Sequence, residues 1–232
     1  MGKFQINDTE ALKKVEHPLI KNREFYIPES YRFYNNLAEK DKWQRTRVWL
    51  GRVIDTIYIR LHRDIVLDAF AGAGVLSAFY LLHGYQVIAI EKNPALALAL
   101  KENVKSFIAP AAIFEEDNMG VLTLFENNDP RIKIIDLDPY GSCLPQIKEA
   151  ARIIKSGFLF ITCGDIYAGS RFKNWSFTKN RYGIEFSGPA KDYPVKVIYP
   201  FIQKEFQKRD KSTQLLDYFS FPTICRLFIA VS

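Results

Sequence analysis

Asp138, Pro139 and Tyr140 form a group that could hold a nucleic-acid base for chemistry at an amino group. They close an apolar run, 132–137, which predicts a buried strand ending in Asp138, and the proline fixes a turn there. A carboxylate and a backbone carbonyl in such a turn can accept both hydrogens of an exocyclic amine, which frees the nitrogen lone pair to attack a carbon. This transfer needs positioning more than a strong base. We therefore predict that these three residues are catalytic.

Gly72 and Gly74 belong to a second group, a loop of small residues between a predicted strand, 65–68, and a predicted helix, 75–83. Glycine permits the positive φ or the close approach to a ligand that a tight turn requires, and the helix after it points unpaired N–H groups at the same space. Glu91 ends the next predicted strand, where its carboxylate could accept both hydroxyls of a ribose. The two features together indicate an adenosine ligand.

Asp68, at the end of the first of these strands, distinguishes between adenosine ligands. A carboxylate there would repel a pyrophosphate and attract an ammonium group, and Ser77 stands where a dinucleotide fingerprint has its third glycine. S-adenosyl-L-methionine is therefore favoured as the cofactor, and the stretch resembles motif I of class I methyltransferases. The resemblance implies cofactor contacts from Asp68, Phe70, Gly72, Gly74, Glu91 and Lys92. Phe70 could also line the target pocket or pack in the core.

An acidic stretch, 115–118, follows a third predicted strand, 111–114. In the methyltransferase arrangement an acid at this place accepts a hydrogen bond from the adenine amino group. The resemblance therefore implies cofactor contacts from Asp117 and Asn118. A solvated acidic loop is the alternative interpretation.

The elements around these groups alternate between strands and helices. Asn93 and Pro94 are an N-cap and a first-turn proline, and they open a predicted helix that ends at Phe107. Apolar spacing predicts two further helices, 41–61 and 193–208, and the last two strands, 215–221 and 226–231. The alternation indicates a doubly wound, Rossmann-like α/β sheet of seven strands, with an antiparallel terminal edge hairpin as in class I methyltransferases.

Two parts of the chain are expected to have different roles. Residues 1–63 are expected to form a basic and aromatic extension with a capping helix, and residues 64–232 the S-adenosylmethionine-dependent methyltransferase domain. The first residues, Met1 to Glu16, are polar and are expected to be flexible or loosely packed. With 232 residues, 48% hydrophobic and 25% charged, the chain is long enough for a sizeable core.

The three cysteines, Cys143, Cys163 and Cys225, lie far apart in the sequence and form no Cys-x-x-Cys pair. Neither a metal site nor a disulfide framework is therefore indicated. The N-terminal stretch lacks a long apolar segment, and the chain has no run of about 18 apolar residues. We expect a cytoplasmic protein that is neither secreted nor membrane-spanning.

The net charge of +6 is unevenly distributed, with +5 over residues 1–63, −5 over 64–168 and +6 over 169–232. An acidic middle that holds a cationic sulfonium, with basic flanks, suits an enzyme that acts on a polyanion, although solvated surfaces are also often basic. The stretch 170–182 has four cations, four aromatic residues and no acid. We expect it either to be a plain surface loop or to contact nucleic acid through Arg171, Lys173, Trp175, Lys179 and Arg181.

Residues 136–142, which read Asp-Leu-Asp-Pro-Tyr-Gly-Ser, and residues 157–165 carry a more specific resemblance. They resemble the Asp-Pro-Phe/Tyr-Gly-Ser motif and the fifth strand, ending in Thr-x-x-Asp, of the tRNA guanine N2-dimethyltransferases. Residues 221–231 are similar to the closing strand of that family, with Ile224 and Cys225 where a His-Tyr pair usually precedes the arginine.

The stretch Phe33-Tyr34-Asn35 is similar to a Phe-Tyr-Asn element of the same family. An arginine downstream of that element contacts the cofactor carboxylate, which implies such a contact from Arg45 or Arg47. The resemblance covers roughly residues 25–232. Members normally carry a C-terminal tRNA-binding domain, which the sequence does not contain after the catalytic part, so a separate RNA-binding partner chain is an expectation.

The function implied is S-adenosylmethionine-dependent methylation of an exocyclic base amino group in nucleic acid, with guanine N2 of tRNA as the expected target. Methylation of adenine N6 or cytosine N4 in DNA is one alternative, although that chemistry usually has Asp-Pro-Pro-Tyr where Gly141 follows a single proline here. A small-molecule or protein methyltransferase would leave the basic flanks without a purpose. A non-catalytic RNA-binding partner subunit would have no need of the group at Asp138.

Overall fold

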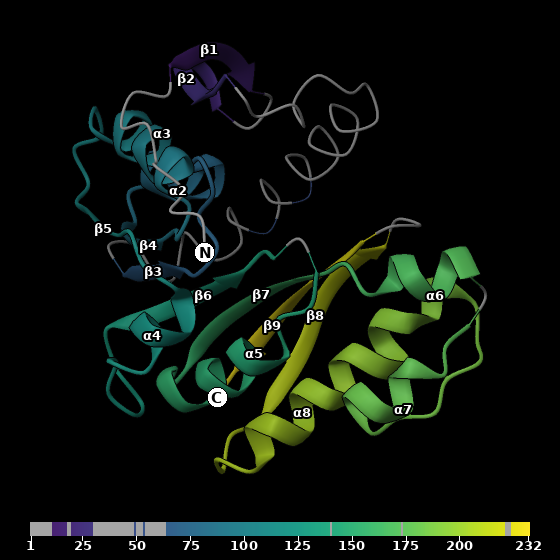
Figure 1. Ribbon diagram of the computed structural model, residues 1–232. Helices are drawn as coiled ribbons and strands as arrows, with labels where there is room; N and C mark the ends of the chain where they lie inside the picture. Colours follow the sequence, from purple (N-terminus) through teal and green to yellow (C-terminus); the bar gives the residue numbers. More distant parts are fainter. Residues whose placement is uncertain are drawn as a thin grey trace, which may run out of the picture.

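The protein is described by a computed structural model in which a seven-stranded sheet carries helices on both faces (Figure 1). The structure describes residues 11–17, 20–29, 49, 53, 64–139, 141–172, 174–220 and 224–232. The strand order in the sheet is β5-β4-β3-β6-β7-β9-β8. Its parallel strands are β3 (Ile65–Asp68), β4 (Gln86–Ile90), β5 (Ala111–Phe114), β6 (Ile132–Leu137) and β7 (Gly157–Cys163).

Two further strands close the sheet as an antiparallel hairpin, β8 (Thr213–Ser220) and β9 (Cys225–Val231), and β9 pairs antiparallel with β7. The predicted doubly wound, Rossmann-like sheet with an antiparallel edge hairpin is thereby confirmed. The order of the parallel strands reverses between β3 and β6, where Asp68 lies opposite Asp136. At such a switch point the loops diverge and leave a crevice for ligands at the carboxyl ends of the strands.

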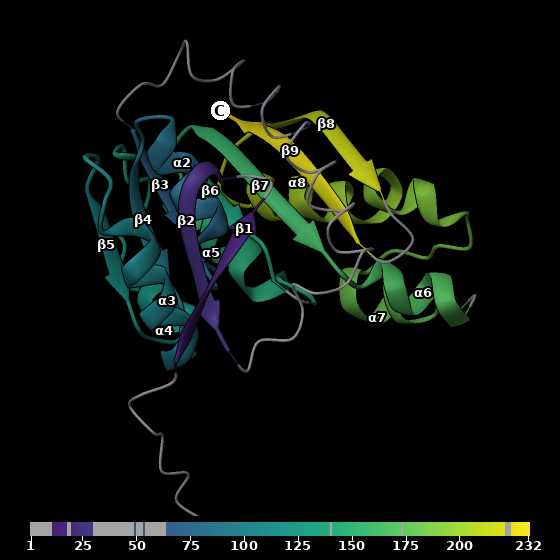
Figure 2. The ribbon, with the colours of Figure 1, turned by 90° about the horizontal axis from the view of Figure 1, so that it is seen from above.

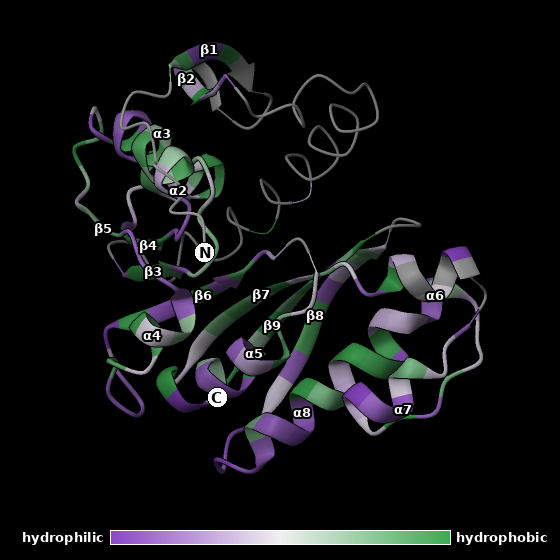
Figure 3. Cartoon of the chain, viewed as in Figure 1, coloured by the Kyte–Doolittle hydropathy of each residue, from purple (hydrophilic) through white to green (hydrophobic). Residues whose placement is uncertain are grey.

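Each face of the sheet has its own hydrophobic core (Figures 1 and 3). Two helices, α2 (Val75–Leu82) and α3 (Pro94–Val104), cover one face, and α5 (Leu144–Ile153) and α8 (Tyr199–Gln207) cover the other. Successive strand residues point to opposite faces, so Val66 belongs to the core under α2 while Leu67 belongs to the core under α5. Burial on both faces explains why the parallel strands are continuous apolar runs in the sequence.

A helical lobe follows β7, and Figure 2 shows it beyond the end of that strand. Its elements are α6 (Ile166–Phe172), α7 (Phe177–Tyr182), a 3₁₀ turn (Ala190–Asp192) and a π-helical turn (Pro194–Ile198) that continues into α8. The helix predicted at 193–208 thus exists, but its first turn is wider than an α-helix. Pro200 has no N–H to bond the carbonyl four residues before it, which is consistent with the wide turn.

The N-terminal part contains a β-hairpin that the sequence did not predict, β1 (Leu12–His17) and β2 (Ile20–Pro28). Figure 2 shows it beside α2 and α3, and Phe25 and Ile27 are buried in the same core as those helices. The expectation of a loosely packed start is therefore wrong for residues 12–16. The division of the chain at residue 63 stays a prediction, but the hairpin packs directly on the second part.

Most of the helix predicted at 41–61 lies outside the described residues. Trp49 and Val53 are described, and both are helical. The indole of Trp49 packs edge-on against Phe160 and Phe219, and its Nε1 donates a 2.7 Å hydrogen bond to Asp217 Oδ2. Trp49 therefore packs at the β7–β8 side of the sheet.

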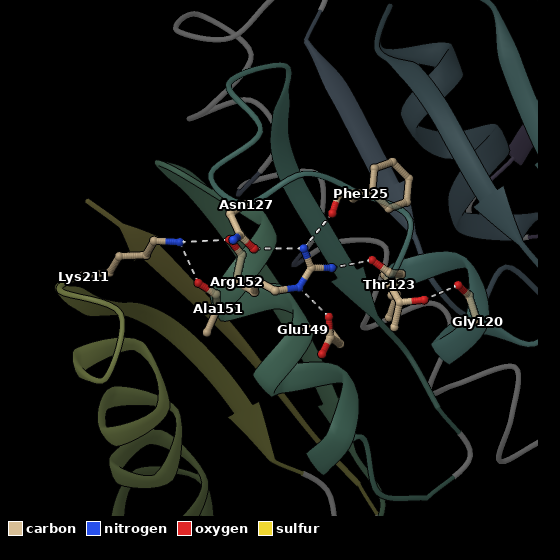
Figure 4. Close-up of polar contacts among 9 residues, drawn as sticks. Gly120, Thr123, Phe125, Asn127, Glu149, Ala151, Arg152 and Lys211 are labelled. Carbon is tan, nitrogen blue, oxygen red and sulfur yellow. Dashed lines mark hydrogen bonds and ion pairs between the residues drawn. The ribbon is translucent and has the colours of Figure 1, made fainter.

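Two basic side chains, Arg152 and Lys211, donate hydrogen bonds at the carboxyl end of α5 (Figure 4). Arg152 donates hydrogen bonds to the carbonyls of Leu122 and Phe125 at 2.7 and 2.6 Å, which ties α5 to the end of α4 (Asn118–Leu122). Lys211 Nζ donates to the carbonyls of Ala151 and Ile154, each at 2.6 Å. Burial lowers the pKa of the Lys211 ammonium to about 8. The carbonyls left unpaired at the end of α5 thereby gain partners inside the fold.

The fold brings together the three cysteines, which are distant in the sequence. Cys163 and Cys225 are opposite one another on β7 and β9, and Cys143 Sγ lies 3.8 Å from the carbonyl of Thr162. All three thiols are buried and free. Within the described ranges, no helix is both long and apolar enough to cross a membrane.

Candidate active site

A cavity of about 570 Å³ lies at the carboxyl ends of the parallel strands. Loops after four of them, β3, β4, β5 and β6, line it together with Thr162 near the end of β7, so the candidate residues converge at the switch point of the sheet. The cavity brings together eight residues selected from the sequence: Phe70, Gly72, Glu91, Lys92, Asp117, Asn118, Asp138 and Pro139. Four other selected residues, Arg45, Arg47, Tyr140 and Lys173, lie outside the described residues.

The glycine loop is held to the end of β4 by Glu91. Gly72 has a φ of +55°, and its N–H donates to Glu91 Oε2 at 2.9 Å. The other carboxylate oxygen, Oε1, accepts from the N–H of Asn93 at 2.7 Å. Two backbone donors therefore fix the orientation of the Glu91 carboxylate, and each oxygen retains a lone pair for a further donor.

Gly74 has the positive φ that the sequence predicts, and its contact with the cofactor stays a prediction. Its φ of +86° disfavours any other residue, and a Cβ built on it would lie 2.5 Å from Leu100 Cδ1 of α3. It is the N-cap of α2 and lies outside the lining of the cavity. The glycine is thus required by the turn and by the close packing of α3, while Gly72 faces the cavity.

Asp68 lies behind the glycine loop and is fully buried. Its Oδ2 accepts a 2.6 Å hydrogen bond from the hydroxyl of Ser77, so the residue found in place of the third glycine holds the strand-end acid. Burial, with a further contribution from Asp136, raises the pKa of Asp68 to about 8. In this structure the Asp68 carboxyl group is therefore hydrogen-bonded within the fold, behind the loop. A direct contact between Asp68 and a ligand stays a prediction.

Asp117 and Asn118, both predicted to contact the cofactor, differ in how available their side chains are to a ligand. Asp117 caps α4 by accepting from Met119 N at 3.0 Å, and its exposed carboxylate lies 3.7 Å from Lys92 Nζ at the rim of the cavity. Asn118 is engaged within the fold, because Nδ2 donates to the carbonyl of Ala69 at 3.0 Å and Oδ1 accepts from Gln146 Nε2 at 2.9 Å. Asp117 is thus the side chain of this pair that is available to a ligand.

Asp138 lines the cavity with a quarter of its side chain exposed, and a buried arginine lies behind it. Arg226 of β9 donates to Asp136 Oδ2 at 2.5 Å and to Thr162 Oγ1 at 2.6 Å, and its NH1 lies 3.5 Å from Asp138 Oδ1. The hydroxyl of Tyr80 also donates to Asp136 Oδ2, at 2.5 Å. Burial raises the pKa of Asp136, which Arg226 opposes.

Among the residues that sequence reasoning did not select, Gln146, Thr162 and Ile224 line the cavity and Arg226 lies behind it. Thr162 had a usable signal, because it lies near the carboxyl end of a predicted strand, as Asp138 does. Arg226 is a charge within the apolar run of β9, which is a signal for a buried partner.

The loop between β7 and the basic stretch 170–182 is joined to the loop after β6 by a hydrogen bond from Gly164 N to the carbonyl of Gly141, at 3.0 Å. Two of its cations have partners on the fold itself. Arg181 lies 2.8 Å from the buried Asp165, and Lys179 forms an exposed ion pair with Glu185. Arg171 contacts the hydroxyl and the ring of Tyr167. The acids just outside 170–182 therefore offset part of the charge counted in the sequence.

Trp175 packs against other residues of the helical lobe. Its ring is stacked on Tyr193 with centroids 5.0 Å apart, and a Cβ on Gly169 would lie 2.1 Å from the ring atoms. Tyr193 therefore covers part of the indole, which stays partly exposed at a cavity that Gly169 and Asn174 also line. The contact of Trp175 with nucleic acid stays a prediction.

Solved structures with the same fold include Trm1 from Pyrococcus horikoshii in complex with S-adenosyl-L-methionine, with 18% sequence identity and a TM-score of 0.71. The similarity covers 95% of this chain and 62% of that one, so the chain spans less than two thirds of Trm1. TYW2 from P. horikoshii, in complex with MeSAdo, has 15% identity and a TM-score of 0.63, covering 96% of this chain and 72% of that one. Trm5b from Pyrococcus abyssi has 14% identity and a TM-score of 0.61, over 95% of this chain and 55% of that one.

No curated protein matches the sequence at a significant level. The sequence model of one family does match, over residues 15–214. This range includes the hairpin β1–β2 almost from its start, the glycine loop and the group at Asp138. The chain therefore belongs to the N2,N2-dimethylguanosine tRNA methyltransferase family.

Proposed function

We propose that the protein is an S-adenosylmethionine-dependent methyltransferase that acts on an exocyclic base amino group of nucleic acid, with guanine N2 of tRNA as the target. One observation carries the proposal: a single cavity joins the ribose-type carboxylate Glu91 to the amine-holding group at Asp138 and Pro139. Membership of the tRNA methyltransferase family supports the same reading. So does the solved complex of Trm1 from P. horikoshii with S-adenosyl-L-methionine.

The residues at the β3–β5 side of the cavity suit the cofactor. The Glu91 carboxylate, held by two backbone donors, would accept the ribose hydroxyls, and Asp117 at the rim would accept from the adenine amine. The buried Asp68, which accepts a hydrogen bond from Ser77, lies behind the glycine loop that would face the cofactor. The cofactor supplies a methyl group on a sulfonium, a carbon that an amine can attack.

Asp138 and the Pro139 carbonyl would hold the target amine on the other side of the cavity. By accepting the two N–H groups they orient the nitrogen lone pair toward the methyl carbon. As the new N–C bond forms and the S–C bond breaks, the nitrogen becomes cationic, and the Asp138 carboxylate stabilises that charge. The surplus proton leaves the nitrogen through Asp138 to water, which restores a neutral methylamine.

The substrate class is proposed from charge. Residues 169–232 carry a net charge of +6, and the described cations of the stretch 170–182, Arg171, Lys179 and Arg181, are exposed. Such a surface attracts a phosphate backbone without specifying its sequence.

The test is a methylation assay with unmodified total tRNA and, separately, with duplex DNA, followed by mass analysis of the nucleosides. Methylguanosine formed in tRNA alone is the expected result. N6-methyladenine or N4-methylcytosine in DNA would replace the proposal with its DNA alternative. Cofactor binding without transfer to either substrate would favour a non-catalytic partner subunit.

A further inference from the structure

Arg226 contacts two side chains that line the cavity. Arg226 itself does not line the cavity. It lies opposite Thr162 in the β7–β9 register, and its guanidinium extends over the ring of Phe160 at 5.6 Å toward the acids of β6. One nitrogen, NH1, lies 2.6 Å from Thr162 Oγ1 and 3.5 Å from Asp138 Oδ1. The hydroxyl and the carboxylate are therefore neighbours that share one donor.

The direction of these contacts determines what Thr162 can do. A guanidinium only donates hydrogen bonds, so Thr162 Oγ1 must act as the acceptor toward Arg226. The hydrogen of the Thr162 hydroxyl then has to point to another acceptor. Because Thr162 lines the cavity beside Asp138, an acceptor on a bound molecule can occupy that place.

Charge explains why an arginine is needed. Three carboxyl groups, Asp68, Asp136 and Asp138, lie at the switch point, and Arg226 is the cation that the structure places against two of them. The planar fork of arginine can hold Asp136 through one nitrogen while the other reaches Thr162 and Asp138. A lysine ammonium has the same charge but would be centred at one point.

We propose that Arg226 is a positioning residue that sets Asp138 and Thr162 as an acceptor–donor pair for the target base. Asp138 accepts from the exocyclic amine, and Thr162 donates to the ring nitrogen next to it. The bases with such an amine, guanine, adenine and cytosine, all have an unprotonated ring nitrogen beside it, whereas uracil and thymine do not. The inference rests on the proposed function, because it concerns the amine that Asp138 holds.

Three variants test the pair. Thr162→Val removes the hydroxyl with little change of shape, Thr162→Ser retains it, and Arg226→Lys retains the charge but not the fork. We expect Thr162→Val and Arg226→Lys to lower kcat at least about tenfold while the cofactor Kd stays within about threefold of the wild type. Thr162→Ser should restore most of the rate, since the hydroxyl and not the methyl group matters.

Tyr80→Phe is the matched control. It removes the other hydrogen bond to Asp136 in the same buried network, but touches neither Asp138 nor Thr162. It should lower the melting temperature and leave kcat unchanged. If Tyr80→Phe lowers kcat as much as Arg226→Lys does, the effect is general loosening of the network and the proposal is overturned.

Crystal structures of the wild type, Thr162→Val and Arg226→Lys provide a readout that needs no substrate. We expect the Asp138 carboxylate to turn away from its wild-type position in Arg226→Lys and to keep it in Thr162→Val. An unchanged Asp138 in Arg226→Lys overturns the proposal whether or not the wild type methylates tRNA. Absence of any transfer by the wild type, with Asp138 displaced in that variant, instead rejects the proposed function alone.

Discussion

Asn103 donates a 2.7 Å hydrogen bond from Nδ2 to the carbonyl of Ala73, inside the glycine loop. The same side chain pairs with the backbone of Tyr26 in β2, accepting from its N–H at 2.7 Å and donating to its carbonyl at 2.8 Å. Asn103 is buried on α3. It therefore ties the N-terminal hairpin, which lies far away in the sequence, to the loop that faces the cofactor side of the cavity.

Replacing Asn103 with Leu should destabilise both the N-terminal hairpin and the glycine loop. The change removes three hydrogen bonds and leaves buried backbone groups of Tyr26 and Ala73 unpaired, so we expect a loss of about 2–4 kcal/mol in the free energy of unfolding. Urea unfolding measures this, and hydrogen exchange at the Tyr26 amide should become faster. Lys105→Ala, which removes an exposed ion pair with Glu102 on the same helix, is the control and should change stability little. An unchanged Tyr26 exchange rate in Asn103→Leu would contradict the coupling.

The parallel half of the sheet could be predicted from the sequence because its strands are buried on both faces and read as short apolar runs. The hairpin could not, because β2 shows no clean apolar alternation: Phe25 and Ile27 belong to the core, whereas Arg23 and Glu24 just before them are exposed. The cavity residues selected from strand ends were brought together because parallel strands present their carboxyl ends at one edge. Trp175 and Arg226 show the limit of this reasoning. Their environments depend on segments distant in sequence, Tyr193 for the first and Asp136 for the second.

Glu91 variants should weaken cofactor binding. Glu91→Ala removes the carboxylate proposed for the ribose and the partner of Gly72 N–H, so we expect about a ten- to hundredfold loss of affinity for S-adenosylmethionine. Glu91→Gln should be nearly as poor, because both carboxylate oxygens accept from backbone N–H groups and an amide would turn its NH₂ toward one of them. Calorimetry measures both. Wild-type affinity in Glu91→Gln would argue that one oxygen suffices.

The buried Asp68 should make stability depend on pH. Its pKa, raised to about 8 in the fold by burial, is near 3.8 in a free side chain. Between these values the folded state keeps a proton that the unfolded state has lost, so this group's contribution to stability falls as the pH rises from about 4 to about 8. Asp68→Asn is neutral throughout and can still accept from Ser77. Relative to the wild type it should gain at least about 1 kcal/mol between pH 5 and pH 8 in urea unfolding. A constant difference would show that Asp68 is ionised in the fold.

RNA affinity should depend on the exposed cations after β7. If Arg171 and Lys179 contact phosphates, replacing both with glutamine should flatten the dependence of log K on log salt concentration by about one to two units. Trp175→Phe serves as the comparison, since it removes no charge and the indole packs on Tyr193, so it should affect the lobe's stability more than the salt slope. Filter binding of tRNA between low and moderate salt measures the slopes. An unchanged slope in the double variant would move the RNA path to the N-terminal basic stretch.

Asp138 should be required for transfer and not for cofactor binding. Asp138→Ala leaves the Glu91 side of the cavity intact, so we expect nearly unchanged cofactor affinity and at least about a hundredfold lower methylation rate, because the amine loses its alignment. Asp138→Asn should also be slow, since an amide keeps an acceptor but not the charge that stabilises the cationic nitrogen and interacts with Arg226. Tyr140→Ala should mainly weaken substrate binding, with Tyr140→Phe mild if the ring stacks on the base. Single-turnover assays with pre-bound cofactor separate these effects, and a wild-type rate in Asp138→Ala would reject the mechanism even with cofactor binding established.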